Sequence, residues 1–336
     1  MPDCRHFAVR AATFTELLGP GFETSSAVDG DDRQTDARLE AWCRSSADGE
    51  WRLFHRRLAR DGWDIDFITR RFRGARPTST ELPSWVRDAG WIRNLLAAPP
   101  QFGEGDAFPF ADLFVPLVDA ADSRLCSRVG AAGMRMLGPG ARRDLRRMLM
   151  RDVTELCAPA LYERFTQCPV GYRSFIDEVD LIGLVDDKPV LLRLIATLVR
   201  QWLDNMAEFV ERLRGDAQQL GGIVDGGAGS PVSRVQGPLS DRHDDGRAVL
   251  LVEFVDGHRA VYKPREQQAA VACGELVAWL NAQDPPTLLR TPRTMARDGY
   301  AWSEFIEHAG CDRDAEVARF FSRAGACLAL LYCLAP

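Results

Sequence analysis

The chain has 336 residues, of which 46% are hydrophobic and 27% charged, and these values are typical of a soluble globular protein. Its formal net charge of −6 gives no basic field that would attract nucleic acid or an anionic membrane, so we expect no nucleic-acid partner. The nine cysteines form no C-x-x-C pair, which argues against a zinc module and a disulfide framework. We find no signal peptide and no uninterrupted apolar run near the ~18 residues that span a bilayer, and therefore expect a cytoplasmic protein.

Residues 1–230 are predicted to be mostly helical. The segment "PVLLRLIATLVRQWLDNMAEFVERL" (189–213) has apolar residues three and four apart, which is the pattern of an amphipathic helix. The segment 141–165 has a similar period. The Gly-rich stretch "GGIVDGGAGS" (221–230) follows and is predicted to be a flexible connector. It lacks the Gly-Lys-Ser/Thr ending of a P-loop, which disfavours that class of nucleotide-binding protein.

Short β-type segments follow the connector. "AVLLVEFV" and "RAVYK" are joined by Asp256-Gly257, which predicts a hairpin because Gly accepts the positive φ of a tight turn. Residues 266–282 are predicted as a helix, "YAWSEFI" (300–306) as a strand and 315–334 as an apolar helix. This order of elements predicts an α+β fold.

Lys263 ends the second strand of this hairpin, in a chain where Lys188 is the other lysine among 42 basic residues. Alternate strand residues share a face, so Val261 and Lys263 should point the same way. An apolar side chain beside a flexible ammonium suits a nucleotide cleft, where one contacts the base and the other the phosphates. The alternative is an exposed edge-strand lysine without a function.

The polar turn "LSDRHDDGR" (239–247) precedes the hairpin. In kinase-type folds a turn between two strands covers the phosphates, and His243 has an ordinary pKa of ~6.5, which suits an acid or a base. The alternative interpretation is a solvated surface turn.

These segments together resemble a known family. The motif "SDRHDDGRAVLLVEFVDGHRAVYKPR", followed by "YAWSEFI" and "RAGACLALLY", is similar to the dehydratase domain of class II lanthipeptide synthetases, the LanM enzymes of lantibiotic biosynthesis. Ser240 stands where the family pattern most often has Gly, which is a mild departure. Upstream segments such as "YRSFIDEVD" also resemble the helical part of that domain, so the resemblance covers nearly the whole chain.

The resemblance implies a fold akin to lipid kinases. Residues 1–230 would be the helical region, 231–310 a kinase-like N-lobe and 311–336 the first helix of an incomplete C-lobe. It also implies a two-step reaction on a ribosomally made precursor peptide with a leader. A Ser or Thr hydroxyl is phosphorylated from ATP with Mg²⁺, and phosphate is then eliminated to leave dehydroalanine or dehydrobutyrine.

The resemblance also assigns site residues. Asp241 and His243 are the candidate catalytic residues at the phosphate-covering turn, and Lys263 is expected to contact the ATP phosphates. Glu275, on the following helix, is a candidate ion-pair partner of this lysine. Val261 is a candidate contact for the base, and Arg247 and Arg265 are candidate anion contacts or structural ion-pair partners. The remaining candidate ATP-binding residues, Glu304, Phe305 and Ile306, lie at the position of a kinase hinge, where Glu304 can equally be structural.

The chain ends before the segment that carries the catalytic loop and the metal-binding aspartate in the family. We therefore expect no metal ligands and no cyclase zinc here, and we expect the chain alone to be inactive. It would be a fragment or one half of a split enzyme whose missing C-terminal half is a partner. Two other functions stay open, a non-catalytic module that binds the precursor peptide and a different kinase-like phosphotransferase.

Overall fold

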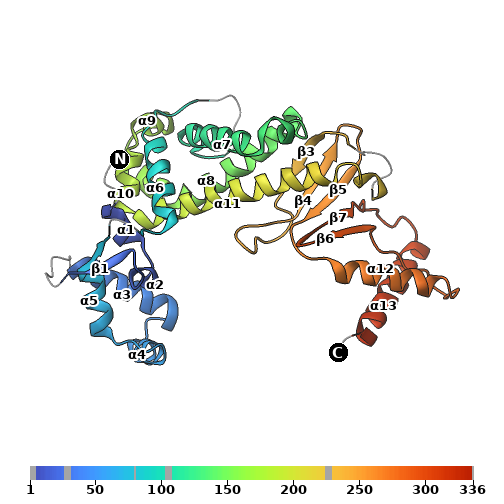
Figure 1. The fold of residues 1–336 in the computed structure, drawn as a ribbon, viewed down its shortest axis with the longest axis horizontal. Helices are drawn as coiled ribbons and strands as arrows, with labels where there is room; N and C mark the ends of the chain where they lie inside the picture. Colours follow the sequence, from blue (N-terminus) through green and yellow to red (C-terminus); the bar gives the residue numbers. More distant parts are fainter. Residues whose placement is uncertain (1–4, 26–31, 79–80, 103–107, 224–228, 335–336) are drawn as a thin grey trace. The chain divides into compact units, whose positions relative to one another are not determined.

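The computed structural model describes residues 5–25, 32–78, 81–102, 108–223 and 229–334 (Figure 1). Residues 224–228 of the predicted connector lie outside the described residues. The fold is α+β, as predicted, because long helices are combined with two antiparallel sheets. The chain divides into two compact units, of which unit 1 comprises 1–120 and 150–200 and unit 2 comprises 121–149 and 201–336.

The division does not follow the boundary that we predicted near residue 230. Residues 121–149 and 201–230 belong to the same unit as the larger sheet. Three long helices, α7 (Val115–Met134), α8 (Pro139–Gln167) and α11 (Pro189–Asp216), contribute residues to both units.

Unit 1 is mostly helical and contains a small sheet in which strand β1 (Phe22–Thr24) pairs antiparallel with β2 (Ala75–Pro77). Its other elements are α1 (Arg5–Ala11), α2 (Phe14–Leu17), α3 (Asp32–Ala47), α4 (Trp51–Arg60), α5 (Ile65–Gly74), α6 (Ser84–Leu96), the 3-10 turn Ala111–Leu113, α9 (Tyr172–Glu178) and α10 (Leu181–Asp187). The ring of Phe14 is buried and packs edge-on against Trp63, Phe67 and Phe72. This aromatic cluster therefore joins α2, α5 and the loop before α5 that carries Trp63.

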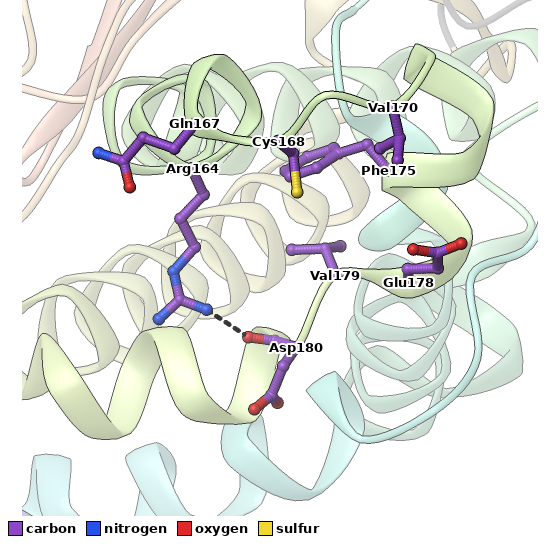
Figure 2. A pocket seen from close by; sticks show the side chains of 8 residues that line it. All are labelled: Arg164, Gln167, Cys168, Val170, Phe175, Glu178, Val179 and Asp180. Atoms are coloured by element: carbon purple, nitrogen blue, oxygen red, sulfur yellow. Dashed lines mark hydrogen bonds between the residues drawn. The ribbon is translucent and has the colours of Figure 1, made fainter.

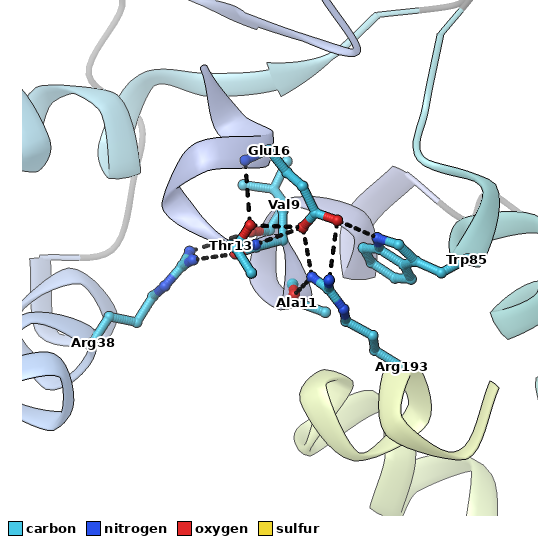
Figure 3. Close-up of polar contacts among 8 residues, drawn as sticks. Val9, Ala11, Thr13, Glu16, Arg38, Trp85 and Arg193 are labelled. Carbon is cyan, nitrogen blue, oxygen red and sulfur yellow. Dashed lines mark hydrogen bonds and ion pairs between the residues drawn. The ribbon is translucent and has the colours of Figure 1, made fainter. Parts of the chain in front are cut away.

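Glu16 is the polar centre of unit 1 (Figure 3). It closes a capping box with Thr13 at the start of α2 and forms an ion pair with Arg193 at 2.6 Å. Trp85 Nε1 donates to the same carboxylate at 3.0 Å. Burial raises the pKa of Glu16, but the hydrogen bonds from Thr13 and Arg193 outweigh it, so the net pKa is below the ordinary 4.5.

Unit 2 contains a five-stranded antiparallel sheet with the strand order β3-β4-β5-β7-β6. Its elements are β3 (Val232–Gln236), β4 (Leu250–Phe254), β5 (Arg259–Lys263), α12 (Gln268–Asn281), β6 (Thr294–Arg297), β7 (Tyr300–Glu304) and α13 (Asp314–Leu334), with the 3-10 turn Leu220–Gly222 before the sheet. The predicted hairpin is present, with Gly257 at φ 85° between β4 and β5. Strand β6 was not predicted from the sequence, because its four residues, TMAR, are too few to show an alternation.

The two faces of this sheet have different surroundings. Tyr262 and Trp302 are neighbours across β5 and β7, with ring centroids 5.0 Å apart, and both pack on Phe209 of α11. The residues that alternate with them, Val261 and Lys263 on β5, therefore point to the opposite face.

Asp216, at the end of α11, holds the helix to this sheet. Its buried carboxylate accepts hydrogen bonds from Arg297 Nε at 2.9 Å, Tyr300 Oη at 2.8 Å and Trp302 Nε1 at 2.9 Å. These donors lie on β6 and β7, so one side chain joins α11 to two strands.

Helix α13 differs from the other long helices because none of its described side chains is buried. It has 21 residues and a mean hydropathy of 1.4 over its most apolar 18 residues, so it could cross a membrane by length and composition. We expected no transmembrane segment because no uninterrupted apolar run nears 18 residues, and that expectation stays a prediction, since the apolar window of α13 includes Arg319 and Arg323. One such helix is weak evidence for a membrane span.

Replacing Asp216 with Ala should lower the free energy of unfolding of the part that contains the sheet by about 3 kcal/mol, since three donors lose a buried charged acceptor. Urea unfolding followed by tryptophan fluorescence measures the change. The control Asp204→Ala removes a pair with Arg128 in which both side chains are about half exposed, and should change the free energy by less than about 1 kcal/mol. Equal effects of the two substitutions would contradict the central role of Asp216.

The Glu16 cluster should make unit 1 sensitive to acid. Because the folded-state pKa of Glu16 is lowered, its stabilisation is fully present above the unfolded pKa of 4.5 and is lost as the pH falls through the folded value. We expect Glu16→Gln to reduce the pH dependence of stability below about pH 5, measured as urea midpoints at successive pH values. Glu163→Gln, which removes an exposed pair with Lys188, should leave that dependence unchanged.

Candidate functional site

Lys263 is a half-buried cation on β5. It lies opposite Ala301 of β7, and Val261 on the same face lies opposite Ser303. In the part of the chain that the structure describes, no carboxylate pairs with its ammonium, and the positive charge of Arg265 acts on it. Burial, and then the repulsion from Arg265, lower the pKa of Lys263 below the ordinary 10.5. A half-buried cation without an anion is a place where an anionic ligand gains free energy.

Lys263 shares its face of the sheet with Ser303, Thr294 and the apolar Val261 and Leu251. Ser303 is 1% exposed, and its hydroxyl lies 3.0 Å from that of Thr294 on β6. Leu251, on β4, lies opposite Val261 and is also buried. Sequence reasoning missed Ser303 and Thr294, although the alternation around Trp302 could have placed Ser303 on the same face as Lys263.

The turn 241–247 is anchored to α11. Arg247 forms an ion pair with Glu208 at 3.0 Å, and Asn205 donates to the carbonyl oxygen of Asp245 at 3.0 Å. The hydrogen bond to Glu208 raises the pKa of Arg247. The structure thus gives Arg247 the structural ion-pair role, which was one of its two predicted roles.

The tip of this turn has an unusual backbone. Asp244, Asp245 and Gly246 all have positive φ, at 42°, 63° and 83°. His243 and Arg247 close the turn with two main-chain hydrogen bonds of 3.0 and 2.8 Å. A tight main-chain loop of this kind exposes its N–H groups, although the two aspartates disfavour an anion there.

The predicted catalytic residues and Lys263 are not brought into contact. Asp241 and His243 are exposed, and Arg247 contributes to the electrostatic environment of Tyr262, which points to the face opposite Lys263. The reason is the anchoring by α11, because Glu208 and Asn205 hold the turn beside the helix that covers the Tyr262 face.

The other predicted residues have these positions. Arg265 is exposed directly after β5, and Glu275 is exposed on α12 and forms no ion pair with Lys263, so that predicted pair is absent from the structure. Glu304 binds Arg293 through its carboxylate at 3.4 Å and its main-chain N–H donates to the Arg293 carbonyl at 2.8 Å. Phe305 lies under the Arg259 guanidinium at 4.4 Å, and Ile306 is exposed. Glu304 therefore has the structural role that we left open.

No three His, Cys, Asp or Glu side chains come together as a metal site in the described ranges of the chain. Lys263 and Arg265 are two cations that act on each other at the end of β5.

A family model described as a domain of unknown function (DUF4135) matches residues 189–335, which is less than half of the chain. No curated protein matches the sequence. The match begins at the first residue of α11 and ends after α13, so it includes the helix that packs on the sheet as well as the sheet itself.

The lowered pKa of Lys263 can be measured directly, because the chain has two lysines and ¹³C labelling at Cε therefore gives two resonances. Lys188→Arg identifies which is which. We expect the Lys263 resonance to report a pKa below 10.5. Arg265→Gln should raise this pKa, since a repelling charge is removed. Arg259→Gln on the same strand should leave it unchanged. A pKa at or above 10.5 would show that Lys263 is an ordinary surface lysine.

Proposed function

We propose that the sheet of unit 2 binds a nucleoside triphosphate, and that the chain is part of a lanthipeptide dehydratase of the kind it resembles. The observation that carries this proposal is the half-buried ammonium of Lys263, which has no carboxylate partner among the described residues and lies beside Arg265. The apolar Val261 and Leu251 adjoin it on the same face, as a base-binding surface requires.

The strand order supports a kinase-like lobe. In the small lobe of kinases the lysine lies on the third strand, and a helix follows before the last two strands. Here Lys263 ends the third strand of the sheet, α12 follows, and β7 lies between β5 and β6. Glu304 ends the last strand, and residues 305–306 would then follow it at the position of a hinge, where main-chain groups can contact a base.

The proposed chemistry has two steps. ATP, when bound with Mg²⁺, supplies the γ-phosphoryl group for a Ser or Thr hydroxyl of a precursor peptide. Removal of the Cα proton then expels phosphate and leaves a carbon–carbon double bond. The unmodified side chain would have to expel hydroxide, which is a poor leaving group. Lys263 and Arg265 would hold the phosphate oxygens and offset their charge, and positioning of this kind provides most of the catalysis of phosphoryl transfer. A cytoplasmic location is part of this proposal, since ATP is the phosphoryl donor.

One observation favours the alternative of a non-catalytic peptide-binding module. The turn 241–247, which should cover the phosphates, is held on α11 by Arg247 and Asp245, on the side of Tyr262. A nucleotide site of the kinase type would need this turn on the Lys263 side. The nucleotide-binding test below separates the two functions, because the binding module does not need ATP.

ATP with Mg²⁺ should shift the Cε resonance of Lys263 in a saturable way and raise its pKa, because bound phosphate stabilises the charged form. We expect Lys263→Gln to weaken ATP binding at least tenfold, a loss of about 1.4 kcal/mol, since charge-assisted hydrogen bonds are lost. Lys188→Gln is the matched control, as it removes the other lysine and should not alter binding. ATP binding of undiminished strength in Lys263→Gln would refute the proposal.

A further inference from the structure

Unit 1 contains a pocket of about 370 Å³ that has no part in the proposed nucleotide site (Figure 2). It lies between the end of α8, the loop 168–171 and the junction of α9 with α10. Its size is at the lower end of ligand pockets, which suits one large side chain and parts of its neighbours.

The floor of the pocket is apolar and held in place. Phe175 is 3% exposed and packs edge-on against Phe165, with ring centroids 5.2 Å apart, and also against Phe110. Val170 and Val179 are half-buried beside it. Because the aromatic cluster fixes α9, the pocket exists before any ligand binds, and a ligand would not have to order it.

The polar side chains of the pocket differ in what they can still bind. Arg164 is already used, because it donates to the main-chain oxygen of Asp180 at 3.0 Å and pairs with Asp187 at 3.0 Å. The Asp180 carboxylate caps α10 by accepting from the Gly183 N–H at 2.8 Å. Glu178 is exposed at the rim, and none of the described basic side chains pairs with it.

The charged side chains that line the pocket are two acidic ones, Glu178 and Asp180, and one basic one, Arg164. Residues 163–188 contain six acidic and three basic side chains, and two of the basic ones, Arg164 and Lys188, are paired with Asp187 and Glu163. A ligand that places an apolar group on Phe175 would therefore gain from a positive charge beside Glu178.

We propose that this pocket binds a peptide segment in which a large apolar residue is flanked by lysine or arginine. The apolar side chain would lie on Phe175, Val170 and Val179, and the basic neighbour would pair with Glu178. A peptide is favoured over a small molecule because Glu178, Gln167 and Cys168 leave the mouth of the pocket open to solvent. The inference does not depend on nucleotide binding and is tested without nucleotide.

Cys168 lines the pocket and its thiol is exposed, so a bound peptide should slow its alkylation. Cys311 is also exposed but does not line the pocket, and it is the internal reference. The probes are three capped pentapeptides, which place a phenylalanine between two lysines, a phenylalanine between two glutamates, and an alanine between two lysines. Mass spectrometry follows the alkylation of each cysteine by iodoacetamide in the full chain. We expect the first peptide to protect Cys168 at a concentration at least tenfold lower than the other two, with no protection of Cys311.

Charge reversal at the rim provides the matched variants. Glu178→Lys should make the glutamate-flanked peptide the better ligand, whereas Asp177→Lys, the same change on an exposed residue that does not line the pocket, should keep the preference for lysine. Both positions are exposed, so circular dichroism should show an unchanged fold. Equal protection by the first two peptides, equal protection by the phenylalanine and alanine peptides, or the same reversal in both variants would overturn the proposal.

Discussion

The structure of unit 2 depends on the buried carboxylate of Asp216. Three donors from β6 and β7 converge on it, and their hydrogen bonds compensate for the removal of the charge from water. The aromatic contacts of Phe209 with Tyr262 and Trp302 continue the same interface along α11. A sheet that lacked this helix would expose the Tyr262 and Trp302 rings, so helix and sheet form one folding unit.

This packing decides which face of the sheet can bind a ligand. Because Tyr262 is committed to α11, the residues on either side of it in β5 must point the other way, and Lys263 is left half-buried without a carboxylate among the described residues. The same helix also holds the turn 241–247 through Glu208 and Asn205. One helix therefore accounts both for the candidate anion site and for the separation of the turn from it.

Two carboxylates of unit 1, those of Glu16 and Glu178, differ in how many hydrogen-bond donors they already bind. Glu16 accepts from Thr13, Trp85 and Arg193, and its lowered pKa follows from these donors, so nothing remains for a ligand (Figure 3). Among the described residues no basic side chain pairs with Glu178, which lines the pocket together with Phe175, Val170 and Val179. Burial and bonding partners, more than residue type, distinguish a structural carboxylate from one that can recognise a partner.

The sequence by itself determined the local elements: the amphipathic period of α11, the hairpin at Asp256-Gly257 and the alternation that places Val261 and Lys263 on one face are all present. These follow from neighbours a few residues apart, which pattern reasoning can see. Only the tertiary structure decided that Arg247 pairs with Glu208 and Glu304 with Arg293, that Glu275 stays away from Lys263, and that residues 201–230 belong with the sheet. Each of these depends on which of several arginines or carboxylates packing brings within hydrogen-bonding distance, and charges far apart in the sequence carry no local signal of their partners.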